Sequence, residues 1–243
     1  MTVYFVGAGP GAADLVTVRA LRLLEKASLV VYAGSLVPEE LLASCPADAR
    51  LVDSKGLDLD EITALLVGAD ADVVRLHSGD PSVFSAVAEQ ARRLDAAGVA
   101  WEIVPGVPAF AAAAASLGRE LTVPGVSQTV ILSRIAVDAT PMPPGEELPA
   151  LAASRSTLVL HLAVQHIERV VDELAPSYGL DCPAAVVAKA SRPDEVVLRG
   201  TLGDIAAQVR GAGVLRTAVI VVGRALGAQG FPDSHLYSTE RCR

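Results

Sequence analysis

The chain has 243 residues, of which 51% are hydrophobic and 20% charged, enough for one large or two moderate globular domains with a sizeable core. The formal net charge is −8 and the lysines and arginines are not clustered, so we expect no nucleic-acid partner. The mean hydropathy of +0.44 comes from short apolar segments, and none approaches the roughly 20 apolar residues of a membrane-spanning helix.

Neither the N-terminus nor the cysteines indicate export or metal binding. The chain starts with an apolar run and has no basic region or small-residue cleavage site, so we expect a cytoplasmic protein without membrane association. Cys45, Cys182 and Cys242 are odd in number and widely spaced, and the four histidines are dispersed. The sequence therefore predicts neither a disulfide framework nor a metal held by the protein.

The first half of the chain alternates between strand and helix patterns. Two stretches, Thr17–Lys26 and Ser82–Ala97, have one apolar and one charged side, as amphipathic helices do. Such alternation is typical of a parallel sheet covered by helices, here over roughly residues 1–115. Short apolar or β-branched runs predict its strands: Val3–Val6, Leu29–Tyr32, Arg50–Asp53, Val73–His77 and Trp101–Val104.

A second α/β domain is expected after the alanine-rich stretch Ala109–Leu117. We predict an N-terminal domain over residues 1–118, a C-terminal domain over 119–228 and a polar tail over 229–243. The proline-rich run Asp138–Pro149 has the composition of a surface loop.

The order of elements differs in the second domain. The short connection Arg192-Pro193-Asp194 separates two strands closely enough for a hairpin, so this sheet is expected to be mixed. Helices are predicted near Val164–Ala175 and Leu202–Val209. The predicted strands are Thr129–Ser133, Thr157–Leu162, Ala184–Lys189, Glu195–Arg199 and Ala218–Val222.

Three glycine-containing turns follow predicted strands of the first domain. They are V-G-A-G-P-G at Val6–Gly11, H-S-G-D-P-S at His77–Ser82 and V-P-G-V-P at Val104–Pro108. Loops at the carboxyl ends of parallel strands are where open α/β sheets bind ligands, and glycine lets a ligand approach the backbone closely. The three turns together predict a ligand site.

The first turn satisfies the degenerate dinucleotide fingerprint G-x-G-x-x-G/A, but two details argue against a nucleotide. Pro10 removes one N–H from the loop that would bind a pyrophosphate. The second strand ends in Tyr32-Ala33-Gly34, which offers no carboxylate to a ribose. A nicotinamide or flavin cofactor is therefore a minor alternative.

The second turn has an acidic residue, Asp80, where a phosphate site would avoid one. In one interpretation Asp80 caps a helix that has Pro81 at its first position. In the other it faces a ligand whose hydroxyl, amino or sulfonium groups suit a carboxylate. The residues alone leave both open.

Four blocks of sequence make the chain resemble the tetrapyrrole methylase family: G-A-G-P-G at Gly7–Gly11, Y-A-G-S-L-V-P-E-E-L-L at Tyr32–Leu42, H-S-G-D-P-S-V-F at His77–Phe84 and V-P-G-V at Val104–Val107. The run L-G-R-E-L-T-V-P-G-V-S-Q-T-V-I-L-S-R at Leu117–Arg134 is similar to one branch, the precorrin-4 C11-methyltransferases of cobalamin biosynthesis. The resemblance extends to about Leu226.

The resemblance implies a fold, a cofactor and a set of contacts. The fold is the two-domain α/β tetrapyrrole methylase fold, with a mainly parallel first sheet, a mixed second sheet and the active site in the cleft between domains. It also implies a homodimer that uses S-adenosyl-L-methionine and releases S-adenosyl-L-homocysteine. Carried over position by position, the cofactor contacts are Pro10, Ser78, Gly79, Asp80, Val83, Ala109, Phe110, Leu162, Ala163, Ala188, Ala190 and Ala218.

The chain departs from family patterns at two places. Many relatives have serines where this chain has Pro108 and Ala109, so a hydroxyl contact is lost there. The uroporphyrinogen-methylating branch has an aspartate where this chain has Ala33, which argues against that branch and leaves the catalytic base unknown. Because an electron-rich ring carbon attacks the sulfonium methyl directly, orientation in a dry site could supply much of the rate.

The implied substrate is a polycarboxylate tetrapyrrole, whose carboxylates suit arginine. Arg119 and Arg134 are candidate contacts, with solvated surface arginines as the alternative. His77 and His161 end strands and are candidates to orient a substrate group, but a histidine that lines the sheet and is hydrogen-bonded there is the favoured interpretation.

Three functions stay open on the sequence. The first is methylation at C11 of precorrin-4 or its cobalt-bearing counterpart. The second keeps the family but changes the acceptor, to another precorrin carbon or to the modified histidine that diphthine synthases methylate. The third is a non-enzymatic dinucleotide-binding module, which only Gly7–Ala12 favours.

Overall fold

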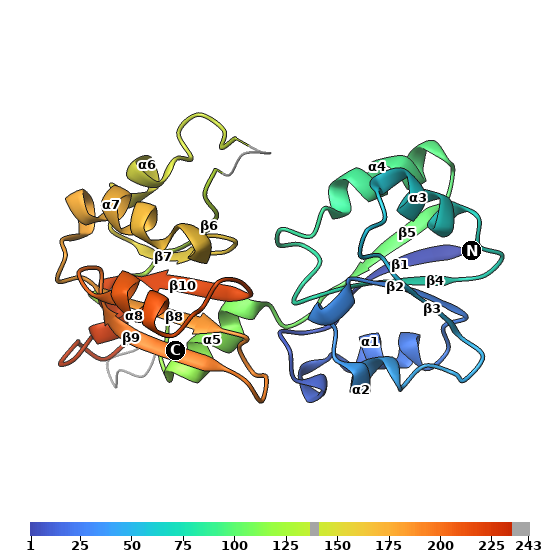
Figure 1. The fold of residues 1–243 in the computed structure, drawn as a ribbon, viewed down its shortest axis with the longest axis horizontal. Coiled ribbons are helices and arrows are strands. Elements are labelled where there is room, and N and C mark those ends of the chain that lie inside the picture. The colour runs from blue at the N-terminus through green and yellow to red at the C-terminus, as the bar shows by residue number, and fades with distance from the viewer. Residues whose placement is uncertain (137–140, 235–243) are drawn as a thin grey trace, which may run out of the picture. The chain divides into compact units, whose positions relative to one another are not determined.

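The computed structural model describes residues 1–136 and 141–234, which form two compact units, Met1–Ala112 and Ala113–Arg243 (Figure 1). The division falls inside helix α5 (Ala109–Leu117), whereas the predicted boundary after residue 118 lies just beyond the end of this helix. The predicted limits of the two domains and of the tail therefore stay a prediction.

The first unit contains a fully parallel five-stranded sheet in the order β3-β2-β4-β1-β5. All five predicted strands are present, and the parallel arrangement is confirmed. Its 3₁₀ turns are η1 (Ala13–Leu15) and η2 (Gly34–Leu36), and its helices are α1 (Val18–Leu24), α2 (Glu39–Leu42), α3 (Leu59–Val67) and α4 (Val87–Ala96). The strands are β1 (Thr2–Gly7), β2 (Leu29–Tyr32), β3 (Arg50–Asp53), β4 (Val73–His77) and β5 (Ala100–Val104).

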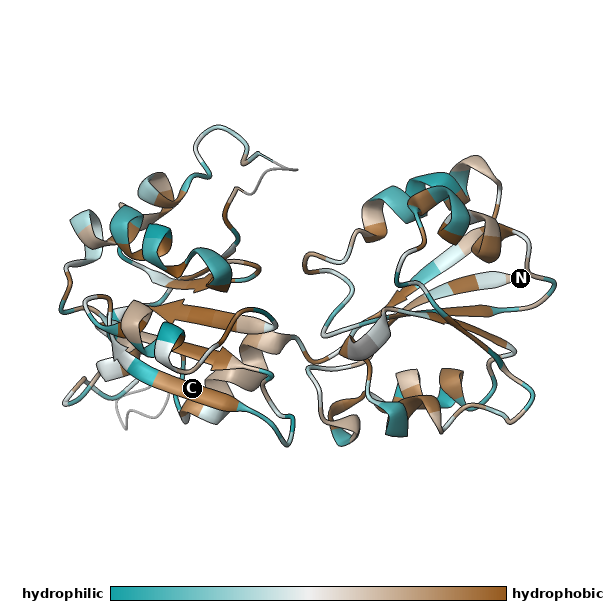
Figure 2. Cartoon of the chain, viewed as in Figure 1, coloured by the Kyte–Doolittle hydropathy of each residue, from teal (hydrophilic) through white to brown (hydrophobic). Residues whose placement is uncertain are grey.

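Helices cover both faces of this sheet, as Figure 1 shows for α1 and α2 on one side and α3 and α4 on the other. Val6 and Leu76 pack toward Leu24 of α1, while Phe5 packs toward Leu66 of α3 and Leu94 of α4. The hydrophobic strands lie between the two layers in Figure 2. Burial of both faces explains why the central strands β1 and β2 read as continuous apolar runs, whereas the edge strands β3 and β5 are more exposed and contain charged residues.

Helix α4 begins later than predicted. The amphipathic pattern predicts a helix from Ser82, but the helix starts at Val87 and its N-cap, Ala86, has a left-handed backbone at φ 53°. Asp80 and Pro81 therefore do not form the N-cap and first helical position, and that interpretation is wrong. By contrast Thr17 caps α1 as its sequence suggests, because its hydroxyl accepts a hydrogen bond from Ala20 N at 3.2 Å.

A buried arginine connects three elements on the α3 and α4 side of the first sheet. Arg75 of β4 is 6% exposed, and it donates to Val31 O and Ser54 Oγ at 3.2 Å and to Gln90 Oε1 at 3.1 Å. Gln90 in turn donates to Ala86 O at 2.9 Å. Desolvation lowers the pKa of Arg75 to about 10, so the group stays charged at neutral pH.

The second unit contains a mixed sheet in the order β6-β7-β10-β8-β9, in which β6 and β7 are parallel and the other pairs antiparallel. The predicted mixed sheet and the β8–β9 hairpin are confirmed. Besides α5, its helices are α6 (Leu148–Ala152), α7 (Ile167–Tyr178) and α8 (Ile205–Gly211), with 3₁₀ turns η3 (Val164–His166) and η4 (Arg224–Gly227). The strands are β6 (Val130–Ser133), β7 (Thr157–Leu160), β8 (Pro183–Ala188), β9 (Val196–Thr201) and β10 (Ala218–Val222).

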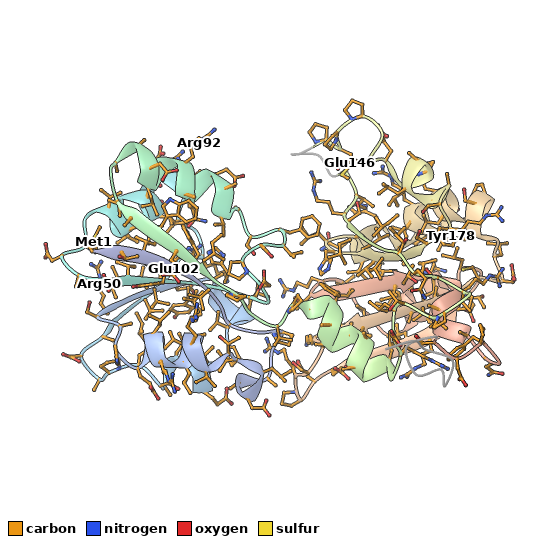
Figure 3. The ribbon with its side chains drawn as sticks, turned by 180° about the vertical axis from the view of Figure 1, so that it is seen from behind. Met1, Arg50, Arg92, Glu102, Glu146 and Tyr178 are labelled. Atoms are coloured by element: carbon orange, nitrogen blue, oxygen red, sulfur yellow. The ribbon has the colours of Figure 1, made fainter. Side chains whose placement is uncertain are left out.

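The core of the second unit lies between its sheet and helices α7 and α8. Leu158, Leu174 and Ile205 are almost fully buried there. Tyr178, labelled in Figure 3, ends α7 and donates its hydroxyl to Ser156 O at 2.6 Å, which ties the helix to the segment before β7. Burial, together with the Cys182 thiol nearby, raises the pKa of Tyr178 to about 12, so this hydroxyl keeps its proton.

Two predicted irregular segments are described only in part. Residues 137–140 of the expected loop and 235–243 of the expected tail lie outside the described residues. Residues 229–234 contain neither helix nor strand, and α6 overlaps the end of the expected loop. Within the described ranges, every helix is too short or too polar to cross a bilayer.

The Arg75 network predicts a measurable stability contribution from Gln90. Gln90→Met removes an acceptor from a buried guanidinium, so we expect the free energy of unfolding to fall by about 2 kcal/mol. Trp101, the single tryptophan, packs in this unit against Phe5, so its fluorescence during urea unfolding is the measurement. Glu89→Met, at the exposed neighbouring position, should change stability by less than about 0.5 kcal/mol. Equal stability of both variants would contradict the role of Gln90.

Candidate active site

The three glycine turns of the first unit meet at the carboxyl ends of β4, β1 and β5, which are neighbours in the sheet. Ala8 N donates to His77 O at 2.7 Å, which joins the first two turns directly beyond their strands. Gly9 and Gly79 then exchange two backbone hydrogen bonds, at 3.2 and 2.7 Å. The structure thus brings the three predicted turns together.

The contact between the turns is so close that two positions accept only glycine. A Cβ atom on Gly7 would lie 2.5 Å from Gly106 Cα and 2.6 Å from Gly79 O. A Cβ atom on Gly106 would lie 2.2 Å from Gly79 O, well inside any real carbon–oxygen contact. Gly79 itself has a φ of 67°, in the left-handed region that side chains disfavour. Glycine at these positions allows the backbones of the three turns to contact one another directly.

Asp80 ties the second and third turns together. Its Oδ2 accepts a hydrogen bond from Gly106 N at 2.8 Å, and its Oδ1 accepts bonds from Ser82 N, also at 2.8 Å, and from Ser82 Oγ. Burial raises the pKa of Asp80, but the hydrogen bonds from Ser82 and Gly106 outweigh it, so that the pKa lies below its ordinary value. The turn therefore carries a negative charge at neutral pH.

The loop after Asp80 is strained. Phe84 and Ala86 have φ angles of 51° and 53°, which cost non-glycine residues on the order of 1–3 kcal/mol each. Ser85 Oγ is within hydrogen-bonding distance of Asp80 O and Val83 O, at 3.2 and 3.1 Å, and Gln90 holds Ala86 O. Strain of this kind clusters at functional sites, and these side chains gave no sign of it in the sequence.

The second unit has a matching group of strained residues at one end of its sheet. Leu162 follows β7, Lys189 follows β8 and Thr217 precedes β10, with φ angles of 54°, 52° and 55°. Strand β10 lies between β7 and β8, with Ala218 opposite Ala188, and Lys189 N donates to Thr217 O at 2.8 Å. The three strained residues therefore lie at the same end of the sheet.

The predicted cofactor residues coincide with these two loop groups. In the second unit they adjoin or include the strained residues: Leu162, Ala163, Ala188, Ala190 and Ala218. Leu162 is 68% exposed, so its side chain is not part of the hydrophobic core. In the first unit, Pro10, Ser78, Gly79, Asp80 and Val83 lie on the loops after β1 and β4, whereas Ala109 and Phe110 are the first two residues of α5, which follows the third turn.

Burial keeps the candidate histidines neutral. His77 is 5% exposed, and desolvation, with a smaller effect of the Arg75 charge, lowers its pKa to about 3. Its Nε2 has no hydrogen-bond partner among the described atoms, and its ring lies 5.9 Å from that of Phe5. Desolvation also lowers the pKa of His161. His77 therefore offers no positive charge to a substrate carboxylate.

The two candidate arginines have different surroundings. Arg119 is exposed, as the alternative of a solvated side chain requires. Arg134 is half-buried and donates to Ile135 O at 3.0 Å and Pro141 O at 3.4 Å, so it supports the segment that follows β6. It also lines a small cavity with Arg169, Glu147 and Glu173. Contact of either arginine with a substrate stays a prediction.

Across residues 1–136 and 141–234, no three His, Cys, Asp or Glu side chains form a metal-binding group.

Known proteins with similar sequences are tetrapyrrole methylases, the family that the sequence motifs at the three turns resemble. The family model of tetrapyrrole (corrin/porphyrin) methylases matches residues 2–206. A precorrin-4 C(11)-methyltransferase of Rhodococcus erythropolis is 64% identical over 246 residues, covering 100% of this chain and 99% of that protein.

Two solved structures are also similar. The X-ray structure of a cobalt precorrin-4 methyltransferase of cobalamin biosynthesis is 39% identical with a TM-score of 0.89, covering 93% of this chain and 95% of that one. A uroporphyrin-III C-methyl transferase of Thermus thermophilus, complexed with S-adenyl homocysteine, is 32% identical with a TM-score of 0.78, covering 93% and 99%.

A parallel sheet with converging glycine turns, followed by a mixed sheet with strained strand ends, defines a two-sheet α/β protein, and open α/β sheets bind ligands at loops of the first kind. The family match and the full-length relatives make the class definite. The chain belongs to the tetrapyrrole methylase family.

The contact between the turns predicts that Gly106→Ala is strongly destabilising. The new methyl group would displace the backbone at Gly79, so we expect a loss of about 2–3 kcal/mol in the urea unfolding of the first unit followed by Trp101 fluorescence. Gly98→Ala is the matched control: it has open space around it but a φ of 66°, so only about 1 kcal/mol should be lost. Similar losses for the two variants would show that the turns relax readily.

The low pKa of His77 predicts an acid-sensitive stability. The unfolded chain binds a proton here below about pH 6.5, whereas the folded chain does so only near pH 3. Stability should therefore fall as the pH drops from 6.5 toward 3, by up to about 1.4 kcal/mol per pH unit from this group. Unfolding free energies of the original chain and His77→Gln, measured across this range, should diverge by that slope. Parallel curves would mean that His77 titrates normally.

Proposed function

We propose that this protein transfers the methyl group of S-adenosyl-L-methionine to C11 of precorrin-4, giving precorrin-5 in the biosynthesis of cobalamin. The observation that carries the proposal is 64% identity to a precorrin-4 C(11)-methyltransferase over the whole length of both chains. The matched region covers both units, so it includes the loops to which we assign the ligands as well as the two sheets. The family match and the structure complexed with S-adenyl homocysteine support the methyl donor.

The loops fit the methyl donor better than a nucleotide phosphate. The ionised carboxylate of Asp80 lies in the second turn, where it would repel a phosphate and attract a cationic sulfonium or amino group. Ala188 and Ala190 have small side chains, which leave room for the adenine and methionine portions of the donor. We assign the donor to these residues and to the other predicted cofactor positions.

In this proposal the protein acts mainly by orientation. The bound donor supplies an electrophilic methyl group on a positively charged sulfur. The loops around Gly79 and Lys189 hold their shape through backbone contacts, so they are organised before the ligand arrives. Because charge on sulfur disappears as the methyl moves, a dry site favours the reaction and no strong base is needed.

The substrate is a tetrapyrrole with several carboxylates, and its charges need cationic partners. Neutral His77 does not supply one, so Arg119 and Arg134 carry this part of the proposal. The resemblance to the family also supports a homodimer that works in the cytoplasm.

Cobalt-precorrin-4 is the second candidate substrate, because the cobalt precorrin-4 methyltransferase has the same fold at 39% identity. The higher identity to the precorrin-4 enzyme favours the metal-free ring.

A methyl-transfer assay with mass detection tests the proposal. With S-adenosyl-L-methionine, precorrin-4 should gain one methyl group per molecule of S-adenosyl-L-homocysteine released, and cobalt-precorrin-4 should react more slowly. Absence of a mass gain with either substrate would overturn the proposal, and methylation of an earlier intermediate alone would reassign the acceptor. As a control for the donor, S-adenosyl-L-homocysteine should raise the melting temperature and NAD should not.

A further inference from the structure

Two strained residues flank one of the proposed cofactor positions. Lys189 and Ser191, with φ angles of 52° and 68°, lie on either side of Ala190, which is 5% exposed. They belong to the loop of residues 189–195 that connects β8 and β9. Residues other than glycine rarely adopt this left-handed backbone conformation, so surrounding contacts must hold the loop in place.

Glu195 supplies such a contact at the far end of the loop. Its Oε2 accepts a hydrogen bond from Ser191 N at 2.6 Å and another from Ser116 Oγ of α5 at 2.7 Å. Arg199 of β9 donates to Ser116 O at 3.0 Å, which fixes the same turn of the helix. One carboxylate oxygen therefore anchors a strained backbone N–H to a helix of the same unit.

The neighbouring carboxylate makes no comparable link. The Asp194 side chain is 55% exposed, and it forms ion pairs with the side chains of Lys189 and Arg192 in the same loop. Exposed ion pairs of this kind contribute little to structure. The two adjacent acidic residues thus differ: Glu195 accepts a hydrogen bond from the backbone N–H of Ser191, whereas Asp194 pairs with exposed side chains.

We infer that Glu195 is a positioning residue for the methyl donor, acting through Ser191 on the backbone of Ala188–Ala190. The inference rests on the proposed function, since it takes these alanines as donor contacts. Without the Glu195 anchor, the strain at Lys189 and Ser191 is released and the loop leaves its binding conformation. We expect affinity for the donor to fall, whereas the rate of methyl transfer from the bound complex should stay nearly unchanged.

Four variants test this role: Glu195→Ala, Glu195→Gln, Ser116→Ala and, as the matched control, Asp194→Ala. For Glu195→Ala we expect the dissociation constant of S-adenosyl-L-homocysteine, measured by calorimetry, and the KM for the donor to rise about tenfold, as for loss of a charge-assisted hydrogen bond. The kcat should stay within about twofold. Glu195→Gln keeps an acceptor oxygen and should restore affinity to within about threefold, and Asp194→Ala should bind normally.

The outcomes separate the two proposals. Failure of the original protein to bind S-adenosyl-L-homocysteine would overturn the assigned cofactor site, not the role of Glu195 alone. Normal binding by the original protein and by Glu195→Ala, or equal weakening by Glu195→Ala and Asp194→Ala, would overturn the positioning role. If Glu195→Ala does not fold, Ser116→Ala decides: it removes one of the two anchoring bonds in a helix that tolerates alanine, and unchanged affinity there would overturn the inference.

Discussion

The carbonyl oxygen of Gly79 lies where any side chain on Gly7 or Gly106 would begin, and the first unit depends on this contact. Three neighbouring strands deliver their following turns to one place, and only backbone fits between them. Because no side chain separates the turns, Gly106 N reaches the carboxylate of Asp80, and Gly9 pairs with Gly79. The apolar strands bring the turns to the same edge, but the absence of side chains at Gly7 and Gly106 lets the turns pack closely.

Strain is the second constraint that the loops share. Phe84 and Ala86 in the first unit, and Leu162, Lys189 and Thr217 in the second, adopt left-handed backbone that ordinary residues avoid. Each costs on the order of 1–3 kcal/mol, which neighbouring hydrogen bonds and the rigid sheets offset. Loops built in this way have few alternative conformations of similar energy. A ligand that fits them loses little free energy in ordering the protein, which favours tight and oriented binding.

The strands were predictable and the site geometry was not, for a physical reason. Apolar runs such as Val73–His77 are set by local burial, so sequence alone located them correctly. Asp80-Pro81 has the local pattern of a helix start, yet the partner of Asp80 is Gly106 N, 26 residues away, and no local pattern encodes that bond. The strained positions were equally hidden, since Leu162 and Lys189 are ordinary residues in an unusual backbone. Resemblance to a family predicts cofactor positions beside these strained residues, but it does not explain the backbone conformation there.

Charge along and beyond β4 explains why the two ligands need different partners. Arg75 is buried against neutral acceptors, and its charge adds to desolvation in keeping His77 neutral. Three residues further along the chain, Asp80 stays ionised because backbone N–H groups and Ser82 stabilise its charge. The accessible end of the strand is therefore negative although a cation lies inside it. A positively charged methyl donor is favoured there and a polycarboxylate is not, which is why the proposed function assigns the acidic groups of the tetrapyrrole to arginines on other elements.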